Sequence, residues 1–143
     1  MTPDVNVLIA ASRAEHSHHV VARAWLTRAI ANATHGEALL LFPMVVASFL
    51  RLVRHPKIFS VPSTPKETVT FVDDLLDRPG VRMPSVGDEW PEFRIACLDA
   101  KLHSNDLPDA WLAASVRSAG DHLVTFDTGF RRLLKRSELT ILS

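Results

Sequence analysis

Cysteine is nearly absent from this chain of 143 residues, because Cys97 is the only one. A disulfide within the chain is therefore excluded, and a reducing compartment is allowed. We interpret Cys97 as a buried, inert thiol and not as a nucleophile, since free cysteines are among the most buried residues. Glycine is also scarce, with 5 residues. No glycine-rich loop of the kind that cradles phosphate is present.

The chain also lacks net charge and long apolar runs. It has 16 Lys and Arg against 16 Asp and Glu, so its formal net charge is +0. General nucleic-acid binders carry a basic field, so any contact with RNA or DNA here would depend on a local patch. No apolar run reaches the length of a membrane span. The N-terminus has no secretory signal pattern, so we expect a cytoplasmic protein with no membrane association.

What the chain does have is enough apolar sequence for a folded core, since 47% of its residues are hydrophobic. We expect one domain over residues 1–143. Short apolar runs alternate with segments of helical periodicity, which predicts an α/β sandwich. Crossovers of this length favour a mostly parallel sheet of four to five short strands. Helices are predicted at about 16–32, 43–54, 64–78, 88–103 and 106–120.

Three aspartates stand where a predicted strand gives way to a helix. They are Asp4, Asp109 and Asp127. Ligand sites of α/β sheets form at the carboxyl ends of strands, so these carboxylates could converge. Two of them at roughly 4 Å would repel by about 4 kcal/mol at an effective dielectric near 20, so the cluster requires protonation or a cation. Hard oxygen ligands select Mg²⁺ or Mn²⁺. The pattern therefore predicts metal-dependent chemistry, and it favours phosphate esters as substrates.

Each of these aspartates has a simpler explanation when it is taken alone. Asp4 and Asp127 could cap the helices that follow them. Asp109 could form a capping arrangement with Asp106 three residues earlier. Capping can explain each aspartate separately, but a shared site better explains why all three occur at such junctions. Helix N-termini also tolerate clustered carboxylates that hold a cation, so both interpretations stay open.

Three segments resemble the signatures of PIN-domain ribonucleases and, more narrowly, of VapC toxins from type II toxin–antitoxin modules. They are residues 4–8 (DVNVL), 105–114 (NDLPDAWLAA) and 124–130 (VTFDTGF). Further residues fall in the order that such toxins show, namely His18-His19, Trp25-Leu26, 49–59 and Trp90. The resemblance covers essentially the whole chain. It implies a single PIN domain, a three-layer α/β/α sandwich with a short, mostly parallel sheet.

The resemblance also implies a function. VapC toxins are Mg²⁺-dependent endoribonucleases that cleave cellular RNA, often tRNA or rRNA. A cognate VapB antitoxin silences them, and they commonly form homodimers. By position, Asp4, Asp109 and Asp127 would be the catalytic, metal-binding residues. Asn6 and Thr125 would orient the carboxylates by hydrogen bonds.

The chain departs from the family pattern at two positions. Many PIN domains carry a glutamate where this chain has Ser48, which can support a metal through water but brings no charge. A further acidic residue often lies where this chain has Gly129. The site would then hold one metal ion in place of two, or hold it weakly. Asp106 could compensate, although a capping role is the favoured interpretation.

Basic side chains supply candidate RNA ligands. Arg131 and Arg132 follow Asp127 in a basic cluster that could grip RNA phosphates. Arg51 is a further candidate. The alternative is a solvated helix face.

Histidines supply one other candidate site. His16, His18 and His19 cluster near a predicted helix start. No matching cysteine or histidine pair follows them, so a transition-metal site is the weaker interpretation.

Two other functions stay open. One is a PIN-fold module that binds RNA or an antitoxin without cutting, because Ser48 replaces a carboxylate. The other is a different metal-dependent phosphoesterase. No phosphate-binding glycine loop or covalent-aspartate motif supports the second alternative.

Overall fold

Five short parallel strands form the centre of the computed structural model, which describes residues 1–99 and 101–143. The first sheet has the order β1 (Thr2–Pro3), β4 (Leu123–Thr125), β5 (Leu139–Ile141). The second sheet pairs β2 (Leu39–Leu40) with β3 (Val81–Arg82). The backbone N–H of Leu40 donates to the Met1 carbonyl at 2.9 Å. This bond joins the two sheets edge to edge, in the order β3-β2-β1-β4-β5.

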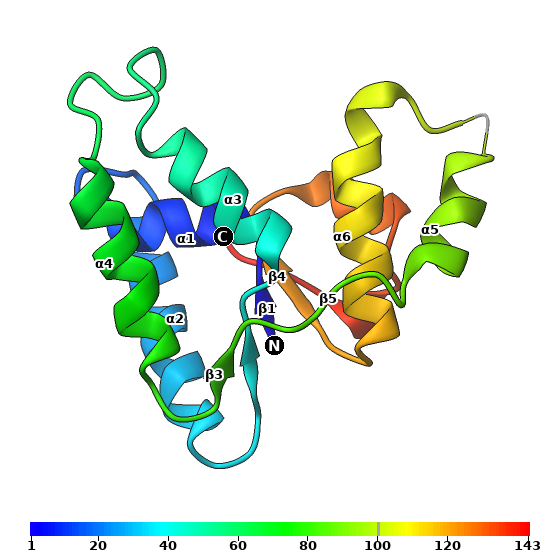
Figure 1. The fold of residues 1–143 in the computed structure, drawn as a ribbon, viewed down its shortest axis with the longest axis horizontal. Helices are drawn as coiled ribbons and strands as arrows, with labels where there is room; N and C mark the ends of the chain where they lie inside the picture. Colours follow the sequence, from blue (N-terminus) through cyan, green and yellow to red (C-terminus); the bar gives the residue numbers. More distant parts are fainter. Residues whose placement is uncertain (100) are drawn as a thin grey trace.

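Helices cover both sides of these strands, as Figure 1 shows. One side carries α1 (Val5–Ser12), α2 (His19–Ala33), α3 (Pro43–Leu52) and α4 (Pro65–Leu76). The other side carries α5 (Trp90–Cys97) and α6 (Leu107–Ser118). Short 3₁₀ turns lie at Ser104–Asp106, Thr128–Arg132 and Arg136–Glu138. The fold is therefore the predicted three-layer α/β/α sandwich with a parallel sheet.

Burial explains why the strands read as short apolar runs. Leu39 and Leu123 are 0% exposed and Val124 is 1% exposed. Parallel strands that are covered on both faces need apolar side chains on both. The main core includes the strands, α1 to α4 and part of α6, and a smaller cluster around Phe93 and Ala110 joins α5 to α6.

Local chemistry sets several helix starts where the sequence predicts them. Proline occupies the first turn of α3 and of α4, where its missing N–H costs nothing. The predicted capping box is present at the start of α4. The Thr64 hydroxyl accepts the Glu67 N–H at 3.2 Å, and Glu67 accepts the Thr64 N–H at 2.7 Å.

Gly80 lies in the turn between α4 and β3, where the backbone of α2 approaches closely. Its φ is +77°, a left-handed conformation that favours glycine. A Cβ at this position would lie 2.2 Å from the carbonyl oxygen of Ala33. Glycine is therefore required for β3 to reach its place beside β2.

Two predictions fail on the α5 side of the molecule. The helix predicted at 88–103 spans only Trp90–Cys97, and Cys97 is exposed, not buried. Ile95 and Leu98 are 68% and 72% exposed, so the end of this helix has little to pack against. Since most helical stability in proteins comes from packing an apolar face, the helix ends early and leaves the thiol in solvent.

The helix predicted at 16–32 also starts later than expected. It begins at His19, because residues 14–18 form turns that connect it to α1.

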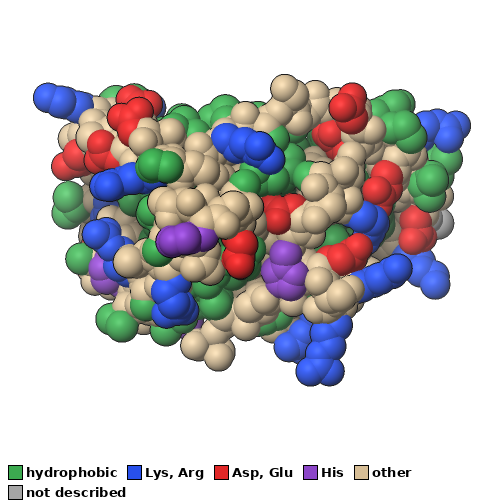
Figure 2. All heavy atoms as spheres, turned by 90° about the horizontal axis from the view of Figure 1, so that it is seen from below, with side chains coloured by type: hydrophobic (Ala, Val, Ile, Leu, Met, Phe, Trp, Pro, Cys, Tyr) green, Lys and Arg blue, Asp and Glu red, His purple; other side chains and the backbone are tan. Residues whose placement is uncertain are grey.

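The surface carries no charge of one dominant sign on the face that Figure 2 shows. Basic, acidic, histidine and apolar side chains are interspersed there. This mixture agrees with the formal net charge of +0. Among the helices of residues 1–99 and 101–143, none combines the length and apolar character needed to span a membrane.

Candidate active site

The predicted aspartates lie around the carboxyl ends of β1 and β4. Asp4 follows β1 directly, and Asp127 comes two residues after β4. Asp109 lies in the first turn of α6, and the strand predicted before it is wrong, because a 3₁₀ turn precedes this helix. In the sheet, β1 lies between β2 and β4. The strands β2 and β3 extend the sheet from one edge of β1, whereas β4 and β5 extend it from the other edge. The strand order thus reverses between β1 and β4, which is where open α/β sheets bind ligands.

Asp4 is held most firmly of the three. Its side chain is buried, and its Oδ1 accepts the Val5 N–H at 2.6 Å. Its Oδ2 accepts from Asn6 Nδ2 at 2.8 Å and from the Thr125 hydroxyl at 2.6 Å. Hydrogen bonds to a carboxylate are stronger than neutral ones, so these contacts fix the orientation of Asp4. Asp4 therefore caps α1, as the simpler explanation predicts, and also lies at the sheet edge where a shared site was predicted.

Asn6 and Thr125 tie the two segments of the site together. Asn6 Nδ2 also donates to Thr125 Oγ1 at 2.9 Å, and Asn6 Oδ1 accepts the Phe126 N–H at 3.2 Å. The Asp127 N–H donates to the Thr125 hydroxyl at 2.9 Å. This network joins the start of α1 to the end of β4.

Asp127 is exposed and caps the 3₁₀ turn that follows it. Its Oδ1 accepts the Gly129 N–H at 2.7 Å. A Cβ at Gly129 would lie 3.0 Å from the same oxygen, so a side chain there would require the Asp127 carboxylate to shift by a few tenths of an ångström.

The charges of the other two carboxylates affect the pKa of Asp109. Burial is the largest cause that raises its pKa, to about 6, and the negative charges of Asp4 and Asp127 add to the rise. Asp106 raises the pKa of Asp109 further, whereas Arg132 lowers it. The pKa of Asp4 is also raised, first by burial and to a smaller extent by the charge of Asp127. The three carboxylates therefore share one electrostatic environment.

The three carboxylates do not meet at a single point. Within residues 1–99 and 101–143, no three His, Cys, Asp or Glu side chains are grouped closely enough to hold a metal ion together. Like charges repel, so the side chains are expected to stay apart unless a cation lies between them. The location agrees with the sequence, but the coordinating geometry would require movement of the side chains.

Ser48 lies in the same region. Together with Asp4 and Asp109 it lines a cavity of about 460 Å³ between α3 and α6. The position where the resembled family often carries a glutamate therefore shares a cavity with two of the acidic residues, and here it carries a hydroxyl.

Asp106 and Arg132 border the site. Asp106 accepts the His103 N–H at 2.9 Å and forms an ion pair with Arg132. Asp106 therefore acts mainly as a cap for the turn before α6, as the favoured interpretation predicts. The same pair places the Arg132 guanidinium next to the acidic region.

The other basic candidates lie on other parts of the described chain. Arg131 lines a different cavity beside β5, together with Arg136. Arg51 is exposed in the last turn of α3, three residues after Ser48. Of the three arginine candidates, Arg132 is the one that the structure connects to the acidic residues.

The histidines do not form a metal site in the described chain. His18 stacks on Phe126, with 4.5 Å between the ring centroids. His19 Nδ1 lies 2.8 Å from the Ala10 carbonyl oxygen. No group of three metal-ligating side chains occurs among the residues that the structure describes, so the transition-metal alternative gains no support.

Sequence reasoning missed one residue of this region. Trp111 lies two residues after Asp109, lines the same cavity and is 42% exposed. The signal that could have found it is an aromatic residue inside the 105–114 segment, two positions after a candidate metal ligand.

The raised pKa of Asp109 predicts an effect on stability. The folded protein holds this proton more tightly than the unfolded chain, so stability falls as pH rises from about 4 to about 6. Above this window the penalty is complete in the metal-free protein. Asp109→Asn is therefore expected to raise the free energy of unfolding at neutral pH by about 1 kcal/mol, after allowance for solvent screening.

Urea denaturation without divalent metal, at acidic and neutral pH, measures this effect. Asp73→Asn, on the exposed side of α4, is the matched control and should change little. An Asp109→Asn variant no more stable than the parent at neutral pH would contradict the assigned electrostatics.

Comparison with known proteins identifies the family. The family model "PIN domain" matches residues 1–135. Ribonuclease VapC43 of Mycobacterium tuberculosis is 35% identical over 130 residues, which cover 90% of this chain and 86% of that protein. Ribonuclease VapC31 of the same species is 33% identical over 132 residues, which cover 90% of this chain and 89% of that protein.

Solved structures agree on the fold. The crystal structure of Mycobacterium tuberculosis VapC20, a sarcin-ricin loop cleaving toxin, matches with a TM-score of 0.66 at 16% identity and covers 92% of each chain. Rickettsia felis VapBC2, bound to a DNA fragment from its promoter, matches with a TM-score of 0.62 at 14% identity, covering 99% of this chain and 98% of the other. The chain therefore belongs to the PIN-domain family and, within it, to the VapC ribonucleases.

Proposed function

We propose that this protein is a divalent-metal-dependent endoribonuclease and the toxic component of a VapBC-type toxin–antitoxin module. The observation that carries the proposal is the electrostatic coupling of Asp4, Asp109 and Asp127 at the switch point of the sheet. Membership of the VapC family supports RNA as the substrate and the cytoplasm as the location.

The donor set of the site suits Mg²⁺, with Mn²⁺ as the alternative. All three charged groups are carboxylates, which are hard oxygen ligands. Their mutual repulsion is relieved by a cation, so a divalent ion fits the charge of the site. Asp4, Asp109 and Asp127 would hold it. When bound, such an ion neutralises the scissile phosphate and lowers the pKa of a bound water.

The protein's own side chains supply the positioning. Asn6 and Thr125 both donate to Asp4 Oδ2 and so fix the most buried ligand candidate. Such supporting hydrogen bonds typically affect metal affinity or activity 10- to 100-fold. Arg132, paired with Asp106, is the favoured contact for an RNA phosphate beside the site. Arg51 and Arg131 would contact RNA at a greater distance.

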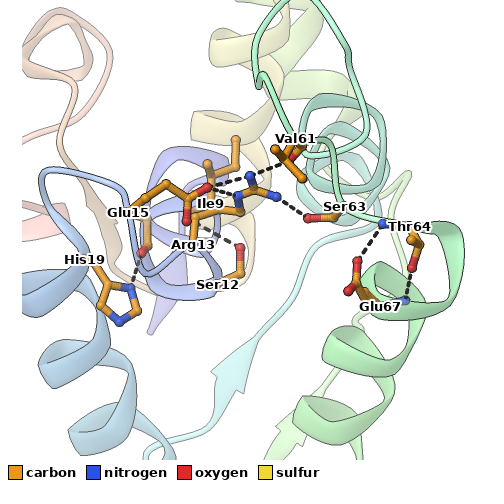
Figure 3. Close-up of polar contacts among 10 residues, drawn as sticks. Ile9, Ser12, Arg13, Glu15, His19, Val61, Ser63, Thr64 and Glu67 are labelled. Carbon is orange, nitrogen blue, oxygen red and sulfur yellow. Dashed lines mark hydrogen bonds and ion pairs between the residues drawn. The ribbon is translucent and has the colours of Figure 1, made fainter.

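A VapB-type antitoxin is the proposed partner, and a second cavity offers a place for it. This cavity, of about 820 Å³, is lined by the start of α4, by Phe49 and by residues 58–64. Arg13 is one of the residues that line this cavity, and Figure 3 shows its polar contacts. Its guanidinium donates to the Ser63 hydroxyl and to the Val61 carbonyl, each at 2.6 Å.

The contacts of Arg13 hold the α3–α4 connection in place. The side chain also pairs with Glu15 and lies 4.4 Å from the centroid of the Phe59 ring. An amphipathic helix of the antitoxin would bind in the groove formed in this way, near the helices around Phe49 and Val69. The VapBC2 complex supports an antitoxin as the partner class. A homodimer is also proposed, since α5 exposes apolar residues such as Ile95 and Leu98.

A non-cleaving PIN module is the second candidate function. Ser48 is the observation that favours it, because this side chain lines the same cavity as Asp4 and Asp109 without adding a charge. Metal-dependent cleavage that disappears with EDTA separates the two candidates. Hydrolysis of a generic phosphomonoester in place of RNA would instead favour another phosphoesterase.

Asp4→Asn is expected to lower RNA cleavage by more than about 100-fold, because it removes charge from the most constrained carboxylate. The measurement is cleavage of total cellular RNA by purified, antitoxin-free protein in Mg²⁺, Mn²⁺ or EDTA. Asp73→Asn serves as the control and should cleave as the parent does. Full activity of a folded Asp4→Asn variant would overturn the assignment of the site.

Ser48→Glu is expected to strengthen metal binding and raise cleavage by about 10-fold or more, since it adds a carboxylate to the cavity that already contains Asp4 and Asp109. Ser48→Gln has the same size without the charge and should give no gain. Metal affinity and cleavage rate are measured for both variants. Equal behaviour of the Glu and Gln variants would show that charge at this position does not limit the reaction.

A further inference from the structure

The cavity that Asp4 and Asp109 line is mostly apolar. Cleavage of a phosphodiester needs charged and polar groups, so it does not explain the apolar side chains. Its polar side chains are Asp4, Ser48, Ser104 and Asp109, whereas Met44 and Trp111 belong to its larger apolar part. Its volume of about 460 Å³ falls in the usual range for pockets that bind small organic groups. The cavity therefore fits an uncharged organic group that is attached to a phosphate.

Trp111 is held in one orientation. Its indole Nε1–H donates to Glu89 Oε1 at 2.5 Å, and Glu89 is only 4% exposed. Its ring stacks on Phe93 at a centroid distance of 5.0 Å and an interplanar angle of 17°. Even so, Trp111 is 42% exposed. A rigid, exposed ring loses little conformational entropy when a ligand binds to it.

The charges around the cavity select the type of ligand. Among the described residues that line it, none is Lys or Arg, and the charged groups are Asp4 and Asp109. An anionic group would be repelled from the apolar part unless a cation were present, whereas a neutral aromatic ring would not. Bases of single-stranded RNA stack on aromatic side chains in this way. A base joined to the reacting phosphate would lie within reach of the cavity, because the carboxylates form part of its lining.

We propose that Trp111 is a base-stacking platform and that this cavity binds one nucleobase of single-stranded RNA next to the phosphate being cleaved. The proposal rests on the proposed ribonuclease function for the identity of the substrate. It assigns to Trp111 a role in binding and positioning RNA, separate from the role of the three aspartates.

Trp90 provides a matched control for Trp111. It is 55% exposed and contacts Phe93 edge-on, with ring centroids 6.1 Å apart. It belongs to the same aromatic cluster but is not among the residues that line the cavity. Trp90→Ala therefore removes an exposed indole while every residue that lines the cavity stays unchanged.

The test measures binding of two end-labelled probes by fluorescence anisotropy. One probe is a short single-stranded oligoadenylate, and the other is the matched ribose–phosphate chain with abasic positions. Mg²⁺ is present, and a denaturing gel confirms that the probes stay intact. The parent and Trp90→Ala should bind oligoadenylate about 10-fold more tightly than the abasic chain. Trp111→Ala should lose about 10-fold in oligoadenylate affinity and should no longer discriminate between the probes.

Two further variants keep the test decisive if Trp111→Ala unfolds. Trp111→Phe retains an aromatic face and should keep most of the discrimination. Trp111→Leu retains apolar packing without a π face and should lose it. If Trp111→Leu discriminates as the parent does, stacking on this residue is excluded. If the variants instead change only self-association or antitoxin binding, the surface belongs to a protein interface and the proposal is overturned.

Failure of this proposal is distinguishable from failure of the proposed function. A parent protein that cleaves RNA with metal, and whose KM is unchanged by Trp111→Ala, would overturn the base site alone. A parent protein that discriminates between the probes but never cleaves would overturn the ribonuclease function and support the base site.

Discussion

The buried carboxylate of Asp4 is the constraint on which the rest of the site depends. A buried carboxylate is costly unless hydrogen bonds compensate for lost hydration, and here the Val5 N–H, Asn6 and Thr125 all donate to it. The same bonds join the start of α1 to the end of β4. Because β1 and β4 are neighbours in the sheet, this arrangement fixes where Asp127 emerges.

Repulsion among the carboxylates raises the pKa of Asp109 and favours the binding of a cation. The pKa of Asp109 rises to about 6, chiefly through burial and also through its acidic neighbours. A divalent cation would remove this penalty, so its binding and the relaxation of the site are coupled. Ser48 contributes no charge at the position where related nucleases often add one, which leaves the site with less attraction for the ion. A base held against Trp111 would compensate by adding substrate affinity that does not depend on the metal.

The sequence predicts those features that local chemistry determines. The helix starts at Pro43 and Thr64 follow from proline and capping rules, and the places of Asp4 and Asp127 follow from where strands end. The strand predicted before Asp109 is a 3₁₀ turn. Features that depend on tertiary contacts were not accessible in this way. The early end of α5 reflects missing packing around Leu98, and Trp111 becomes part of a cavity only because α3 lies opposite. The separation of the carboxylates depends on side-chain conformations, and the hydrophobic periodicity of the sequence gives no information about these.

Calorimetric titration of the purified protein with Mg²⁺ or Mn²⁺ across the pH range around 6 tests the central claim most directly. The claim is that the acidic residues form one electrostatically strained site that a divalent cation relaxes. The account predicts an affinity that rises about tenfold per pH unit below about 6, accompanied by release of a proton from the site. Binding that is independent of pH, or no binding under any condition, would contradict it.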